Sequence, residues 1–313
     1  MSKSLREAYG EALAGLGARD QRIVVLDADL SYATQTCMFA QAFPDRFYNM
    51  GIAEANAVCA AAAFANMGYV PFFSTFAVFG AGRAFEQIRN SVAYVNANVK
   101  LAFTHAGISV GEDGGSHQAI EDIGLMRGLP GMTVMVPCDP LETEKAVRAA
   151  VQINGPVYIR IGRPVCENVT NRDTPFVPGQ AVVLKDGSDL CLTACGLEVH
   201  EALKCAAMLE SEGISTAVVD MHTVKPIDRE VILHYAAKCR ALVTVEEHSV
   251  IGGLGSAVAE VLCGQPVAAF ARIGIQDRFG KSGKPEDLFE AYGLSAGQIA
   301  GRCRSLLAAA GRE

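Results

Sequence analysis

The chain has 313 residues and half of them are apolar, so it is long enough for two domains that each bury a core. The formal net charge is -7 and the lysines and arginines are scattered singly, which excludes a basic surface for nucleic acid. No apolar signal segment opens the sequence, and the alanine-rich stretch 57–65 is too short to span a bilayer. We therefore expect a soluble, cytoplasmic protein with neither nucleic-acid nor membrane partners.

The ten cysteines are dispersed along the chain, and no two of them form a C-x-x-C pair. Cys59, Cys191 and Cys263 lie inside apolar runs, so we expect buried reduced thiols instead of a disulfide framework. A metal site built from Cys191 and Cys195 is the weaker alternative, because no histidine lies at ligand spacing beside them.

The first half of the chain alternates short β-branched runs with amphipathic stretches such as 141–151. This alternation predicts parallel strands covered by helices. The expected strands are 23–26, 70–73, 99–104, 133–136 and 157–161.

The periodicity stops at residues 171–179, where two prolines, a glycine and polar residues indicate a linker. A second alternating set follows, with expected strands at 189–193, 216–220, 241–245 and 267–271. The predicted fold class is therefore α/β, with two parallel-sheet domains. We expect them to comprise residues 1–170 and the smaller 180–313.

Three segments of the first domain carry residues that are suited to catalysis or ligand binding. They are residues 51–56 (GIAEAN), 74–79 (STFAVF) and 111–118 (GEDGGSHQ). By residue type alone, Glu54 can be a surface carboxylate at a helix start, and Phe76 and Phe79 can be core residues at helical spacing. The third segment, with His117 near two carboxylates, is typical of a loop that brings titratable groups to a small ligand.

In order and spacing, these segments resemble the pyrimidine-binding half of transketolase, and the resemblance covers nearly the whole chain. It implies thiamine diphosphate as cofactor. Glu54 would then place its carboxyl against a pyrimidine nitrogen, inside an apolar surround supplied by the neighbouring alanines. Phe76 and Phe79 would form a flat platform for the ring, and Ile52 would contact it as well.

The same resemblance implies a substrate side of the site. His117 would contact the sugar hydroxyl or the carbonyl oxygen that becomes charged, and Asp113 would accept hydrogen bonds from substrate hydroxyls. Arg6, His105 and Arg163 would hold a phosphorylated sugar at the outer end of a channel, since arginine suits bidentate phosphate recognition. On residue type alone, Arg163 can equally cap a strand end.

Two segments depart from the transketolase pattern. After His105 a transketolase has Asp-Ser-Ile-Gly, whereas residues 106–109 here read AGIS. Where the family has a phosphate-binding serine after an Asp-Leu pair, this chain has residues 31–34 (SYAT). These departures leave open a substrate that is unphosphorylated or branched.

The remaining expectation concerns a missing half-site. Transketolases carry a diphosphate-binding domain ahead of this region, with a Gly-Asp-Gly motif and an asparagine that hold a divalent metal, and no such motif precedes Met1. The resemblance therefore implies the C-terminal subunit of a split transketolase, self-associated in an α2β2 heterotetramer. The separate N-terminal subunit would supply the diphosphate contacts and the Mg²⁺ ligands, with none on this chain.

The expected activity is transfer of a two-carbon ketol unit from a ketose to an aldose. More distant relatives leave two enzyme alternatives, a β-subunit of a 2-oxo acid dehydrogenase and a deoxyxylulose-phosphate-synthase-like enzyme. The Glu112 and Asp113 pair argues against the dehydrogenase, whose corresponding loop lacks it, and the split architecture argues against the synthase. An alternative of another class is a non-catalytic regulatory subunit that has kept the fold.

Overall fold

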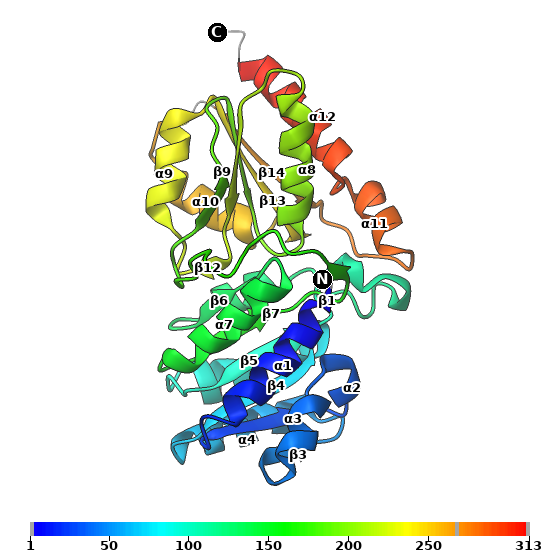
Figure 1. Ribbon diagram of the computed structural model, residues 1–313, viewed down its shortest axis with the longest axis vertical. Coiled ribbons are helices and arrows are strands. Elements are labelled where there is room, and N and C mark those ends of the chain that lie inside the picture. Colours follow the sequence, from blue (N-terminus) through cyan, green and yellow to red (C-terminus); the bar gives the residue numbers. More distant parts are fainter. Residues whose placement is uncertain (1–2, 267–268, 311–313) are drawn as a thin grey trace.

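The computed structural model describes residues 3–266 and 269–310. Two α/β units stand end to end along the long axis of the molecule, with the N-terminal end of the chain near their junction and the C-terminal end at the far tip (Figure 1). A short antiparallel pair, β1 (Lys3–Ser4) with β8 (Val165–Cys166), lies near the junction of the two units.

The first unit is built on a seven-stranded sheet in the order β12-β6-β7-β5-β4-β2-β3. All neighbouring strands in it are parallel except β12 and β6, which pair antiparallel. The strands are β2 (Ile23–Asp27), β3 (Phe47–Asn49), β4 (Val70–Phe76), β5 (Lys100–Thr104), β6 (Thr133–Met135), β7 (Val157–Arg160) and β12 (Thr223–Lys225).

Helices cover both faces of this sheet because successive strand residues point to opposite sides. Val25 and Phe72 pack with α1 (Leu5–Gly17) and α7 (Pro140–Gln152), whereas the adjacent Leu26 and Phe73 pack with α4 (Glu54–Asn66). Helices α1 and α7 lie side by side in Figure 1. The other helical segments of this unit are α2 (Ser31–Thr34), α3 (Cys37–Ala42), α5 (Phe85–Gln87), α6 (Asp122–Arg127), two π-helical turns (Val78–Arg83 and Ile88–Ala93) and two 3-10 turns (Pro44–Arg46 and Ile108–Asp113).

The second unit has a five-stranded sheet in the order β14-β13-β10-β11-β9, parallel apart from β9. Its strands are β9 (Val182–Lys185), β10 (Leu190–Ala194), β11 (Thr216–Asp220), β13 (Ala241–Ser249) and β14 (Phe270–Ile275). Its helices are α8 (Glu198–Glu210), α9 (Arg229–Lys238), α10 (Leu254–Leu262), α11 (Pro285–Tyr292) and α12 (Ala296–Ala310). The predicted α/β class with two largely parallel sheets is thus confirmed.

The strand predictions differ from the structure mainly at the ends and in the short strands. The expected strand 267–271 overlaps β14 (Phe270–Ile275) only at residues 270–271, and residues 267–268 lie outside the described residues. Strand β12 was not expected, because three residues are too few to show a period. It belongs by sequence to the second unit but pairs with β6 of the first sheet. The second unit therefore contributes a strand to the sheet of the first unit.

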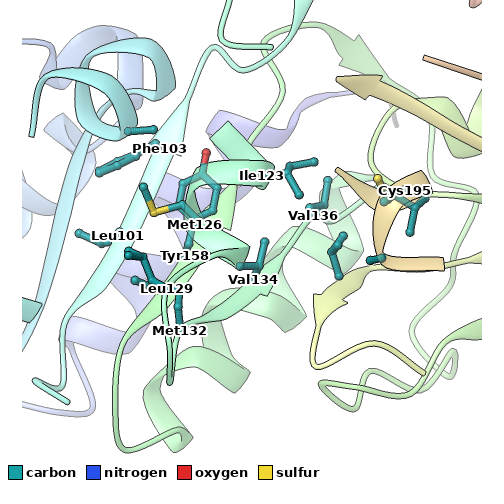
Figure 2. Close-up of a cluster of buried hydrophobic side chains, with 14 of the residues drawn as sticks. Leu101, Phe103, Ile123, Met126, Leu129, Met132, Val134, Val136, Tyr158 and Cys195 are labelled. Carbon is teal, nitrogen blue, oxygen red and sulfur yellow. The ribbon is translucent and has the colours of Figure 1, made fainter. Parts of the chain in front are cut away.

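The two sheets share one apolar core across their junction. Figure 2 shows this cluster running from Leu101 and Phe103, through Met126 and Val134, to Cys195 beside the second sheet. Such a continuous core fixes the two units against each other, because separating them would expose apolar surface to water. The junction is therefore a firm support for a site that draws on both units.

The cysteine prediction is correct for Cys191 and Cys195, which are buried, but wrong for Cys59 and Cys263, which are exposed. Cys59 lies on the outer side of α4, whose inner side is formed by Ala57, Val58, Ala61 and Ala62. Cys263 follows the last turn of α10. All ten cysteines are free thiols. In the part of the chain that the structure describes, no helix combines the length and apolarity required to cross a bilayer.

Candidate active site

Glu54 is the first residue of α4 and its side chain is buried, with 1% of its surface exposed. This burial excludes the alternative of a surface glutamate. Both carboxylate oxygens accept hydrogen bonds from one terminal nitrogen of Arg83, at 2.8 and 2.9 Å. A carboxylate at the first turn of a helix also gains from the positive end of the helix dipole.

The two phenylalanines form a stacked pair near this carboxyl. Phe76 is the last residue of β4 and Phe79 lies in the π-helical turn that follows, with ring centres 5.8 Å apart and planes inclined by 14°. The guanidinium carbon of Arg83 lies 4.7 Å from the centre of the Phe79 ring. Arg83 therefore links the aromatic pair to Glu54 through a cation–π contact and an ion pair.

Two histidines pack against the same aromatic pair. The His105 ring stacks on Phe76 with centres 3.8 Å apart, and the His117 ring meets Phe79 edge-on at 5.4 Å. Burial, followed by the nearby charges of Arg6 and Arg163, lowers the pKa of His105 to about 3. His105 is therefore neutral at physiological pH and can contact a ligand only as a neutral hydrogen-bonding group.

Two of the residues expected to hold a sugar, Arg6 and Arg163, meet at one small cavity of about 260 Å³. Arg6, Arg163, Ser109 and Glu112 line this cavity, together with Pro285 from the second unit. Arg6 donates a hydrogen bond to the Ala33 carbonyl oxygen at 2.7 Å. The segment 31–34, which differs from the transketolase pattern, therefore lies directly beside Arg6.

Arg163 lies 3.7 Å from the carboxylate of Asp113, which sits on the 3-10 turn Ile108–Asp113. Burial and the neighbouring charge of Arg163 lower the pKa of Arg6 from its usual value. Two guanidinium groups whose charges repel one another favour an anion between them. The expected substrate residues Arg6, His105, Asp113 and Arg163 thus lie in one neighbourhood next to the aromatic pair.

One expected cofactor contact is not part of this cluster. Ile52 has 77% of its surface exposed in the segment before α4. A contact between Ile52 and a cofactor stays a prediction. The sequence reasoning also overlooked Arg83, although its position four residues after Phe79 is the spacing at which helical side chains meet.

In the described ranges, 3–266 and 269–310, one group of side chains has the spacing of metal ligands, namely Cys138, Glu142 and Asp220. Neither Cys191 nor Cys195 belongs to it. All three residues are buried where α7 meets β11, and burial raises the pKa of Cys138 and of Asp220 well above the usual values. The Cys138 backbone N–H donates a hydrogen bond to the Glu142 carboxylate at 2.7 Å, and the Cys138 thiol donates one to Asp220 at 3.3 Å. The three residues thus hydrogen-bond to one another.

These observations define a class of protein: a two-unit α/β chain with a buried carboxyl at a helix start, a stacked aromatic pair and a cavity lined by two arginines. The family model described as "Transketolase, pyrimidine binding domain" matches residues 1–167. The model described as "Transketolase, C-terminal domain" matches residues 179–299. The chain belongs to the transketolase family.

Similar proteins extend over the same length. A protein of Methanocaldococcus jannaschii with the name "Putative transketolase C-terminal section" is 48% identical, over 96% of this chain and 95% of that protein. The 6-deoxy-6-sulfo-D-fructose transketolase subunit of a Clostridium species is 41% identical, over 94% and 92% respectively. Human transketolase is 40% identical, and the match spans 96% of this chain but 49% of the human protein.

A solved structure of a split gene transketolase, in the form of an inactive beta4 tetramer, has the same fold. It is 50% identical in sequence and superposes with a TM-score of 0.89. The match covers 98% of this chain and 99% of that one. Chains of this length thus recur in the family as separate polypeptides.

Proposed function

We propose that this chain is the C-terminal subunit of a split transketolase and transfers a two-carbon ketol unit from a ketose to an aldose with thiamine diphosphate. The observation that carries the proposal is the buried Glu54 carboxyl beside the stacked Phe76 and Phe79 rings. The relatives with 40–48% identity are transketolases by name, which favours ketol transfer over the dehydrogenase and synthase alternatives.

The residues fit the pyrimidine half of the cofactor. A buried carboxyl can hydrogen-bond a ring nitrogen, and two parallel phenyl rings offer an apolar face to an aminopyrimidine. When bound, thiamine diphosphate supplies the nucleophilic carbon that a ketose cleavage requires. Glu54 would hold a proton at the pyrimidine nitrogen, and burial of its carboxyl excludes competing water.

The substrate side of the site would be formed by His117, Asp113 and the cavity with Arg6 and Arg163. His117 would hydrogen-bond the substrate oxygen on which negative charge develops, an interaction that is stronger in the transition state than in the ground state. The two arginines would hold an anionic end of the sugar. Phosphate and sulfonate both satisfy this requirement, and the Clostridium relative acts on a sulfonated sugar by name.

A second subunit is part of the proposal. The relatives that match over their full length are named as a section, a subunit and a split gene product. We therefore infer that a separate N-terminal subunit supplies the diphosphate contacts and the Mg²⁺ ligands, in an assembly of two copies of each chain. Self-association of this chain would accompany that assembly.

The test is reconstitution with an N-terminal transketolase subunit, thiamine diphosphate and Mg²⁺. Ketol transfer is measured with a phosphorylated ketose, a sulfonated ketose and a neutral ketose as donors, and with the Glu54→Gln variant as control. We expect transfer from an anionic donor and its loss in the variant. Decarboxylation of a 2-oxo acid without any ketol transfer would contradict the proposal, and inactivity with every donor would favour the regulatory alternative.

A further inference from the structure

We propose that the second unit positions the loop of residues 107–118, here called the substrate loop, through Glu247 of β13 and through the turn of residues 279–285, here called the clamp turn. Glu247 is a positioning residue in this proposal, because it acts through the loop backbone. The inference rests on the proposed function, from which the loop takes its substrate role.

Glu247 reaches the start of the substrate loop from the other sheet. Its side chain is buried, with 3% of its surface exposed, and it accepts a hydrogen bond from the backbone N–H of Ser109. Gly107 has a φ of +85°, and a Cβ atom there would lie 2.3 Å from the Glu247 carboxyl group. The carboxyl is therefore seated on the loop backbone at a place where only glycine leaves room.

The clamp turn packs closely against the backbone at the other end of the substrate loop. A Cβ atom on Gly114 would lie 2.5 Å from the Ser282 hydroxyl oxygen, and one on Gly115 would lie 2.6 Å from the Gly280 carbonyl oxygen. The glycines of this loop therefore allow one domain to approach the other closely, in addition to any approach of a ligand. In Figure 1 the orange segment that leads into α11 lies beside the teal substrate loop.

Gln118 ties the loop and the clamp turn together. Its side-chain amide nitrogen lies within hydrogen-bond distance of the carbonyl oxygens of Ile108 at 3.2 Å, Gly111 at 3.2 Å and Lys281 at 3.0 Å. One buried side chain thus connects both ends of the loop to the second unit. Gly280 of the clamp turn lies against the same side chain, because a Cβ atom on Gly280 would lie 1.7 Å from the Gln118 side-chain oxygen.

The clamped loop carries Asp113 and His117, and Pro285 at the end of the clamp turn lines the cavity with Arg6 and Arg163. A glycine-rich loop without such support would lose much conformational entropy on ordering around a substrate. The clamp fixes the loop before the substrate binds. Loosening it should weaken donor binding and transfer, and should leave the cofactor side around Glu54 and Phe76 intact.

The decisive variant is Gly280→Ala. Gly280 is not among the residues with positive φ, so alanine is compatible with the backbone, but its methyl group would displace Gln118. The matched control is Gly297→Ala on α12, where a Cβ atom would meet no other atom within 4 Å. A second pair compares Glu247→Ala, which removes the acceptor for Ser109, with Glu247→Gln, which retains one.

The first measurement is hydrogen exchange of the 107–118 amides in the isolated subunit, which does not depend on any activity. We expect exchange to rise about tenfold in Gly280→Ala and Glu247→Ala, as one or two lost hydrogen bonds would produce. It should stay unchanged in Gly297→Ala and be largely restored in Glu247→Gln. Unchanged exchange in both Gly280→Ala and Glu247→Ala would overturn the proposal, even if one of them were less stable.

The second measurement uses the assembled complex. We expect the donor KM to rise about tenfold in Gly280→Ala while the affinity for thiamine diphosphate changes less than twofold, as loss of a substrate-side support predicts. A matching loss of cofactor affinity would overturn the assigned role. If the native complex transfers no ketol group at all, the proposed function fails, whereas the exchange data still decide whether the second unit holds the loop.

Discussion

Arg83 donates from one terminal nitrogen to both carboxylate oxygens of Glu54, at 2.8 and 2.9 Å, while its guanidinium lies over Phe79. The carboxyl is almost fully buried, whereas half of the Arg83 side chain is exposed. A buried carboxylate without a partner is costly, so this ion pair explains how the subunit tolerates a charge at the start of α4.

Replacing Arg83 by methionine should destabilise the isolated subunit, because the Glu54 carboxylate stays buried without its hydrogen-bond donor. We expect the free energy of unfolding in urea to fall by about 1 to 3 kcal/mol, the cost of one unsatisfied buried group. The double variant Glu54→Gln with Arg83→Met should lose less than the sum of the two single variants. Additive losses would show that the two residues do not interact in solution.

The Glu54→Gln variant tests the proposed acid–base role in the assembled complex. The amide keeps the shape of the side chain but cannot hold a transferable proton, so ketol transfer should fall by roughly a hundredfold or more. Circular dichroism should show an unchanged fold. The exposed Glu86, three residues after Arg83 in the sequence, gives a control, and Glu86→Gln should keep native turnover. Near-native transfer by folded Glu54→Gln would assign the role to another carboxyl.

Variants of His117 and Phe79 should separate the two sides of the site. His117→Ala should lower turnover by removing a hydrogen bond to the charged substrate oxygen, an effect of at most a few kcal/mol, and should spare cofactor affinity. Phe79→Ala should weaken cofactor binding, because it removes half of the aromatic platform. Both are measured in the assembled complex by cofactor titration and steady-state kinetics. The reverse pattern would mean that the two sides are assigned the wrong way round.

The isolated chain should bind thiamine diphosphate weakly even with Mg²⁺ present, because we propose that the ligands of the diphosphate and of the metal belong to the partner subunit. Isothermal titration calorimetry should show tight binding only after the two subunits are mixed. Tight binding to the isolated chain would contradict the split-subunit proposal while leaving the family assignment intact.

The stability of the subunit should fall as the pH rises from about 5 to 7. Burial raises the pKa of Glu246 and of Glu247 to about 7; hydrogen bonds from Gly255 and Leu254 partly oppose the rise for Glu246, and the Arg160 charge partly opposes it for Glu247. In this pH window the folded form keeps protons that the unfolded form has released, so each carboxyl lowers the free energy of unfolding by up to about 1.4 kcal/mol per pH unit. The other charged or titratable groups around the pair are Asp122, Glu198, His248 and Arg272.

Urea unfolding at several pH values checks this dependence. The Glu246→Gln variant, which cannot titrate, should show a shallower slope than the native chain over the same window. The amide oxygen can still accept one of the hydrogen bonds that Leu254 and Gly255 donate to Glu246, so the variant should fold. A free energy of unfolding that does not fall over this pH range would show that these carboxyls are ionised throughout it.

The local features of the site follow from local patterns. The apolar run 70–73 predicts a strand, observed as the longer β4, and the alanine-rich run after Glu54 is typical of a helix, observed as α4. The segments that carry Phe79 and His117 are identified through their resemblance to transketolase, whereas the strand and the helix are predicted from local periodicity. Such predictions succeed because strand and helix periods are properties of neighbouring residues.

The tertiary structure alone decided which residues meet across the chain. The sequence separates Ser109 from Glu247 by 138 positions, and no periodic signal relates them. The exposure of Cys59, the pairing of β12 with β6 and the clamp on the substrate loop are further results of how the two units pack. Local pattern therefore determined the elements and the chemical groups of this protein, whereas burial, ion pairing and support of the site depend on the shared core that holds the two sheets together.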